Sequence, residues 1–104
     1  MAQLIKVAEI KELVGKNAIV VETTGQKIAL FKVDGKYYAI GDTCTHRGGP
    51  LSEGTLEGIL VTCPWHGAKF DVTTGKVARS PARADVPCYN VVVEGDDINV
   101  EIPT

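Results

Sequence analysis

Two short segments of this 104-residue chain contain four of its five cysteine and histidine residues. The first reads CTHRGGPL and begins at Cys44, and the second reads CPWHGAKF and begins at Cys63. The full pattern is Cys44-x-His46, sixteen intervening residues, and then Cys63-x-x-His66. Thiolate sulfur and imidazole nitrogen are both strong ligands for transition metals. The spacing therefore predicts a metal centre built from two loops, each of which supplies one thiolate and one imidazole.

Two kinds of metal centre fit this ligand set. A single zinc ion could bind two thiolates and two imidazoles in a tetrahedron. Structural zinc sites, however, usually pair cysteine with cysteine and histidine with histidine along the chain. Here both loops are mixed, which favours a binuclear iron cluster with Cys44 and Cys63 on one iron and His46 and His66 on the other. Zinc remains the alternative on the spacing alone.

The sequence resembles the Rieske family, in which C-x-H and a later C-x-x-H bind a [2Fe–2S] cluster through two cysteines and two histidines. The resemblance implies that the cluster ligands are Cys44, His46, Cys63 and His66. It extends over nearly the whole chain and is closest to small soluble Rieske ferredoxins. The further residues that carry it are Gly48, Pro50, Leu51, Pro64, Gly67, Phe70, Asp71, Thr74-Gly75 and the C-terminal VEGDDINVEI.

The ligand set also bears on the reduction potential. Because two neutral imidazoles replace two thiolates, adding an electron costs less than in a four-cysteine cluster, whose potential is about −400 mV. High-potential Rieske subunits have an extra cysteine in each loop and a hydroxyl donor after the second histidine. This chain has Gly49, Trp65 and Ala68 at those positions. With fewer hydrogen bonds to sulfur, we expect a low potential for the family, on the order of −150 to 0 mV.

Composition limits the other function classes. The formal net charge of −2 argues against a nucleic-acid-binding protein, which usually has a basic balance. Apolar runs are only a few residues long, so we expect no membrane span. The N-terminal MAQLIKVAEI lacks the features of a signal peptide, and we therefore expect a cytoplasmic location. In a reducing compartment, clustered cysteine and histidine indicate metal binding rather than disulfides.

The pattern outside the two segments is β nearly throughout. We expect strands over residues 18–23, 27–33, 36–40, 59–62, 68–71, 89–93 and 98–102, with one helical turn over residues 10–14 that ends at Gly15. The dipeptide Asp34-Gly35 between apolar runs predicts a tight hairpin turn. Short strands with frequent turns indicate an all-β fold, an antiparallel sandwich or barrel of Rieske-like type.

The chain is short enough to be a single domain over residues 1–104. Residues 42–87 are richer in glycine, proline, cysteine and histidine than either flank. We therefore expect a cluster-binding subdomain at about 42–87, inserted into a β base formed by 1–41 and 88–104. The third cysteine, Cys88, is expected to be a buried free thiol. Trp65 is expected to pack near the cluster or to shield it, and a role in docking a partner is the alternative.

The residues and the resemblance together predict an electron carrier. An oxygenase of this kind would also need a mononuclear iron, typically held by two histidines and a carboxylate, yet both histidines of the chain are already assigned. We therefore expect no catalytic activity of its own. The resemblance implies a flavin-dependent NAD(P)H reductase as the electron donor and the terminal oxygenase of a ring-hydroxylating dioxygenase system as the acceptor. The alternative is a Rieske-like small subunit of a nitrite reductase or another multi-component oxidoreductase.

Overall fold

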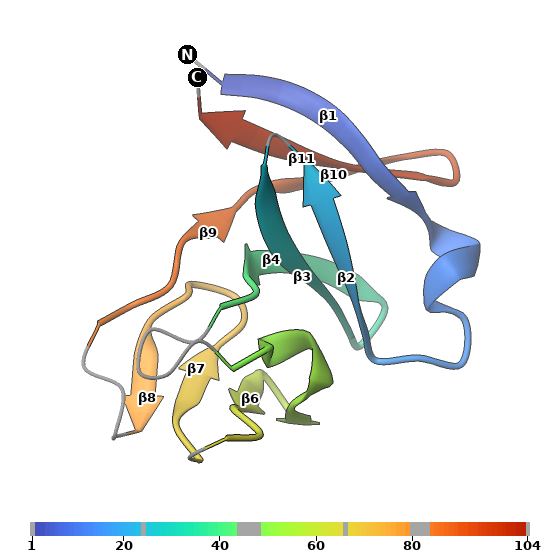
Figure 1. Ribbon diagram of the computed structural model, residues 1–104. Coiled ribbons are helices and arrows are strands. Elements are labelled where there is room, and N and C mark those ends of the chain that lie inside the picture. The colour runs from blue at the N-terminus through green and yellow to red at the C-terminus, as the bar shows by residue number, and fades with distance from the viewer. Residues whose placement is uncertain (1, 24, 44–48, 66, 80–83, 104) are drawn as a thin grey trace.

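The computed structural model describes residues 2–23, 25–43, 49–65, 67–79 and 84–103. Over these residues the chain forms antiparallel sheets and short 3-10 turns, which confirms the expected all-β class (Figure 1). No helix within the described ranges is long and apolar enough to cross a lipid bilayer. The elements are β1 (Ala2–Glu9), η1 (Ile10–Leu13), β2 (Ala18–Thr23), β3 (Gln26–Val33), β4 (Lys36–Gly41), η2 (Leu51–Glu53), β5 (Thr55–Glu57), β6 (Leu60–Thr62), β7 (Lys69–Asp71), β8 (Val77–Arg79), β9 (Cys88–Tyr89), β10 (Val91–Glu94) and β11 (Asp97–Pro103).

The described strands make three sheets. One has the order β1-β11-β10, and its pairing of Ala2 with Pro103 brings the two ends of the chain together at the top of Figure 1. The second has the order β2-β3-β4-β9. The third, β5-β6-β7-β8, is formed only by residues that lie between β4 and β9 in the chain, and it occupies the bottom of Figure 1.

Strand β3 contributes side chains to both hydrophobic cores. Its residues 28–31 are all fully buried. Successive side chains of a strand point to opposite faces. Accordingly, Ile28 and Leu30 belong to the core with Ile98 and Val100 of β11, whereas Ala29 and Phe31 belong to the core with Val61 and Phe70 of the third sheet. The middle sheet is thus covered on both sides.

The predicted hairpin turn at Asp34-Gly35 is confirmed. Asp34 has a φ of 49° and Gly35 a φ of 78°, which are the left-handed conformations that a two-residue type I′ turn requires. The turn sets the β3–β4 register, in which Val33 pairs with Lys36 and Ile28 with Gly41. Strand β4 therefore ends at Gly41, shortly before the segment CTHRGGPL that begins at Cys44.

The first strand, β1, was not predicted from the sequence. Its register with β11 shifts between Lys6 and Ala8, so Val7 is a β-bulge residue. A bulge changes which positions face the core, and the period-2 pattern that identifies a strand is lost there. The predicted helical turn is found as η1, directly followed by Val14 and then by Gly15 with a φ of 77°. Strands β5 and β8 were also missed, since three residues are too few to show a period.

A buried carboxylate fastens the end of β4 to η2. Asp42 is 4% exposed, and its Oδ1 accepts a hydrogen bond of 2.8 Å from the Ser52 N–H. Its carbonyl oxygen accepts another of 2.7 Å from the Leu51 N–H. Leu51 itself is fully buried in the core below β3. These contacts fix the distance between the two ends of the segment CTHRGGPL.

The two-sided burial predicts unequal costs for the same truncation at two valines. Val100→Ala removes two methyl groups from the fully buried core, and we expect the free energy of unfolding to fall by about 2 kcal/mol. Val20→Ala, at a side chain that is 50% exposed, should cost well under about 1 kcal/mol. Urea unfolding followed by circular dichroism measures both, and equal losses would contradict this assignment of the core.

The Asp42 contact makes a second prediction. Asp42→Ala leaves the Ser52 N–H without its acceptor, and we expect the free energy of unfolding to fall by about 1–3 kcal/mol. Asp42→Asn retains a carbonyl oxygen at this position and serves as the matched control, with most of the stability kept. Urea unfolding of the two variants compares them directly. Indistinguishable stabilities would show that the hydrogen bond has no net effect.

Candidate metal centre

The first of the two candidate metal-binding segments, CTHRGGPL, is held at both of its ends. Thr43 and Pro50 form an isolated antiparallel bridge, directly beyond the contacts that Asp42 makes with Leu51 and Ser52. The predicted ligands Cys44 and His46 lie between these anchors, in residues 44–48, outside the described residues. The bridge therefore delimits a short loop that leaves the end of β4 and returns at η2.

The second segment connects β6 to β7. The Cys63 N–H donates a hydrogen bond of 2.7 Å to the Ala68 carbonyl oxygen, and the Gly67 N–H donates one of 3.2 Å to the Cys63 carbonyl oxygen. Gly67 has a φ of 76°, which glycine adopts without strain and which closes this turn. The Cys63 side chain is 2% exposed and belongs to the core with Val61 and Phe70. The predicted ligand His66 lies outside the described residues.

The two segments meet at Gly49 and Cys63. A Cβ atom placed on Gly49 would lie 2.7 Å from the Cys63 Sγ and 3.1 Å from Cγ of Trp65. Gly49, near the end of the first loop, therefore lies beside Cys63, at the start of the second loop. Of the four predicted ligands, Cys63 is the one that the structure describes, and it lies where the loops converge. Within the described ranges no cluster of three or more metal-binding side chains occurs.

The chemistry of this position fits an iron–sulfur cluster. The Cys63 side chain belongs to an apolar core, its Sγ lies beside Gly49, and its backbone N–H is bonded to the carbonyl oxygen of the fully buried Ala68. An apolar surrounding limits the access of water to a thiolate ligand and tunes its reduction potential. Ala68 also has no hydroxyl group with which to donate a hydrogen bond to sulfur, which agrees with the low potential expected for this chain.

A third segment lies beside the loops. The Gly41 N–H donates a hydrogen bond of 2.8 Å to the Pro87 carbonyl oxygen, and the Val86 N–H donates one of 2.9 Å to the Gly75 carbonyl oxygen. The Val77 N–H binds the Asp85 Oδ1 at 2.8 Å. Residues 84–87 of SPARADVP therefore connect the end of β4 to the third sheet. Residues 80–83 lie outside the described residues.

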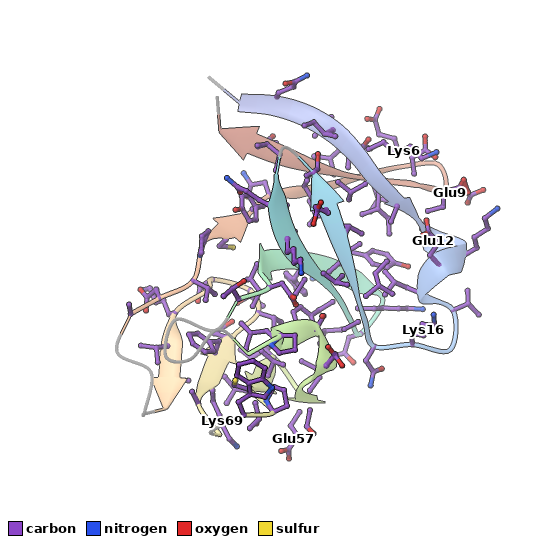
Figure 2. The ribbon with its side chains drawn as sticks, in the orientation of Figure 1. Lys6, Glu9, Glu12, Lys16, Glu57 and Lys69 are labelled. Atoms are coloured by element: carbon purple, nitrogen blue, oxygen red, sulfur yellow. The ribbon has the colours of Figure 1, made fainter. Side chains whose placement is uncertain are left out.

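The described ion pairs lie away from the two loops. Lys6 Nζ is 3.1 Å from Asp97 Oδ1 and 3.6 Å from Glu9 Oε1. These residues lie at the end of the molecule where the last residues of β1 pair with the first residues of β11. Figure 2 shows Lys6 and Glu9 at that end and Glu57 and Lys69 at the opposite end, on the third sheet. The described part of the third sheet thus carries charges of both signs.

The prediction that Cys88 is buried was wrong. Cys88 is exposed, and its thiol donates a hydrogen bond of 3.5 Å to the Thr73 carbonyl oxygen. Its strand β9 has only two residues, and Val86, two positions earlier, faces the core instead. Partial burial, and then the negative charge of Asp71, raise the pKa of the Cys88 thiol. The thiolate of Cys88 is therefore less available at neutral pH than that of an ordinary cysteine.

Sequence reasoning missed the two residues that shape the loops. From the sequence, Gly49 is identified as the position of an absent cysteine, but its place beside the Cys63 Sγ is not predicted. Asp42 was not singled out at all. Its position directly before the first segment was the one signal available, and a carboxylate there is ordinarily a solvated surface group.

Comparison with known proteins gives the chain a family. Residues 3–90 match the Rieske [2Fe-2S] domain. The 3-phenylpropionate/cinnamic acid dioxygenase ferredoxin subunit of Shigella boydii serotype 4 is 46% identical over 81 residues, which are 77% of this chain and 76% of the relative. The ferredoxin component of the naphthalene 1,2-dioxygenase/salicylate 5-hydroxylase systems of a Ralstonia species is 42% identical over 74 residues, 71% of either chain.

Solved structures agree. The ferredoxin of carbazole 1,9a-dioxygenase from Nocardioides aromaticivorans IC177 superposes with a TM-score of 0.90 at 28% identity, over 98% of this chain and 99% of that one. A chain of the complex of reduced oxygenase and oxidized ferredoxin in carbazole 1,9a-dioxygenase gives 0.86 at 35% identity, over 93% and 91%. This family's cofactor is a [2Fe–2S] cluster, which decides against the zinc ion that the ligand spacing had left open. The protein belongs to the Rieske [2Fe–2S] domain family.

Proposed function

We propose that Cys44, His46, Cys63 and His66 hold the [2Fe–2S] cluster and that the protein carries single electrons to the terminal oxygenase of a dioxygenase system. The contact of Gly49 with the Cys63 Sγ is the observation that supports this ligand set best. It brings the first loop, which contains Cys44 and His46 in sequence, against the sulfur of the second. Two separate metal sites would not need this convergence.

The residues of the chain have distinct tasks in this proposal. Cys44 and Cys63 would hold one iron and His46 and His66 the other, and the cluster held there would supply the one-electron chemistry. The apolar core around Cys63 keeps water from that side of the site. Asp42 and the Thr43–Pro50 bridge hold the first loop, and the Cys63–Ala68 hydrogen bond holds the second.

The partners follow from the relatives. One structural neighbour is a ferredoxin in complex with its oxygenase, and the curated relatives are named as ferredoxin components of dioxygenase systems. We propose a terminal oxygenase as the acceptor and a flavin-dependent NAD(P)H reductase as the donor. The protein is then a component of an oxidoreductase system rather than a catalytic subunit. A cytoplasmic location suits this role, because NAD(P)H and reducing conditions for thiols coexist there.

The same proposal divides the chain into two parts. The cluster-binding subdomain covers about residues 42–87, and the β base covers 1–41 and 88–104. The third sheet supports this division, since its strands all lie between β4 and β9 and share a core with only one face of the middle sheet. The boundaries at 42 and 87 stay a prediction.

The ligand assignment predicts opposite outcomes for two cysteines. Cys63→Ser should lower the iron and acid-labile sulfide content by about tenfold or more, because the thiolate ligand is lost. Cys88→Ser replaces the exposed thiol of the same chain and should leave both contents unchanged. Metal and sulfide analysis of the purified proteins, with electron paramagnetic resonance after reduction, measures the difference. A full cluster in Cys63→Ser would remove Cys63 from the ligand set.

Electron transfer itself is tested with a relative's partner. The dithionite-reduced protein is mixed in a stopped-flow instrument with the oxidised terminal oxygenase of a 3-phenylpropionate/cinnamic acid dioxygenase system, whose ferredoxin is 46% identical. We expect reoxidation by one electron per cluster and a midpoint potential on the order of −150 to 0 mV. A potential above about +150 mV would contradict the low-potential assignment. Reoxidation no faster than by buffer would argue against an oxygenase acceptor.

A further inference from the structure

Trp65 combines two properties that rarely occur together. It is 56% exposed, which is a large exposed fraction for the largest apolar side chain of the protein. One side of its indole nevertheless lies against Gly49, which is itself buried. The residue stands in the turn between Cys63 and Ala68, whose backbone hydrogen bonds fix the turn. The hydrogen bonds of this turn therefore hold Trp65 in its exposed position.

The space around Gly49 is filled from two sides. A Cβ atom on this residue would lie 2.7 Å from the Cys63 Sγ, 3.1 Å from Cγ of Trp65 and 3.2 Å from Cδ2 of the same ring. Carbon and sulfur atoms in van der Waals contact are about 3.5–4 Å apart, so neither a methyl group nor a water molecule fits. The Cys63 sulfur and the Trp65 indole therefore both border the space beside the Gly49 backbone, although Cys63 is 2% exposed and Trp65 is 56% exposed.

Glycine is needed at position 49 for space. Its φ lies outside the left-handed region, unlike that of Gly67 in the second loop. An alanine would therefore adopt this backbone conformation without strain. Its methyl group would instead push either the indole or the sulfur out of place. The position thus gives a direct probe of the contact between the two loops.

We propose that Trp65 is a positioning residue that clasps the two cluster loops together, covers Cys63 Sγ against water and so keeps the reduction potential low. The proposal rests on the proposed function, because it takes Cys63 to be a cluster ligand. Uptake of an electron would make the cluster and its ligands together more negative by one charge, and water stabilises added charge more than an apolar ring does. Shielding by the indole therefore disfavours the reduced state and lowers the midpoint potential.

The experiment compares the holoprotein with Trp65→Ala, Trp65→Phe, Gly49→Ala and, as a remote control, Val20→Ala. Two quantities are measured: the midpoint potential, and the rate at which a ferrous chelator removes iron. In Trp65→Ala we expect iron release about tenfold faster and a midpoint shifted to a more positive value. Trp65→Phe keeps an aromatic ring over the glycine and should restore most of both. Val20→Ala should change neither.

Gly49→Ala separates the clasp from a general loss of packing. Its added methyl group should shift the potential and the iron release in the same direction as Trp65→Ala, although the indole is still present. Unchanged potential and iron release in both Trp65→Ala and Gly49→Ala would overturn the proposal. If Trp65→Ala cannot be purified with a cluster, the Gly49→Ala and Trp65→Phe results decide in the same way.

Failure of this inference is distinguishable from failure of the proposed function. The ligand role of Cys63 is tested by the iron content of Cys63→Ser, which does not depend on Trp65. If Cys63→Ser loses the cluster while the Trp65 and Gly49 variants behave as the parent protein, the ligand stays assigned and the clasp is wrong. If Cys63→Ser keeps the cluster, the proposed function itself fails.

Discussion

The burial of β3 on both of its faces is the constraint on which the rest of this structure depends. Ile28 and Leu30 pack toward β11, and Ala29 and Phe31 pack toward the third sheet, so one strand belongs to two cores. An antiparallel sheet can leave one face in contact with water, but the apolar side chains on both faces of β3 require that both faces be covered. The three-residue strands of the third sheet would not be stable by themselves, and they gain their stability by covering the second face.

This arrangement sets where the ligand loops can lie. Strand β4 is paired with β3 through the Asp34-Gly35 turn and ends at Gly41, so the first loop begins at a fixed point. Strands β6 and β7 are held over Phe31 by Val61 and Phe70, and the second loop extends from their ends. Asp42 and the Thr43–Pro50 bridge then close the first loop. The loops converge because the first leaves the end of β4, which is paired with β3, and the second joins β6 and β7, which share a core with one face of β3.

Solvent exposure changes sharply within a few residues of the candidate site. Cys63 is 2% exposed and lies in the core, whereas Trp65, two residues later, is 56% exposed. Such a steep change suits an electron carrier, because sulfur ligands tune the potential best in an apolar surrounding, while electrons must leave through the surface. Cys88 shows the contrast within the same chain. Its thiol is exposed, its pKa is raised, and it does not belong to the core that surrounds Cys63.

The sequence alone indicated the four candidate ligands and their spacing, the all-β class and the Asp34-Gly35 turn, because each is a local pattern with its own chemical or conformational meaning. It did not reveal β1, whose period is broken by the bulge at Val7, nor the three-residue strands β5 and β8, which are too short to show one. It also placed Cys88 in the core, since a short apolar stretch does not show which of its residues face inward. Only the tertiary structure decided that Gly49 lies against Cys63 Sγ and that Asp42 holds the Ser52 N–H. The first contact joins two different loops across 14 positions, and the second joins the two flanks of one loop across 10 positions, so neither follows from a local sequence pattern.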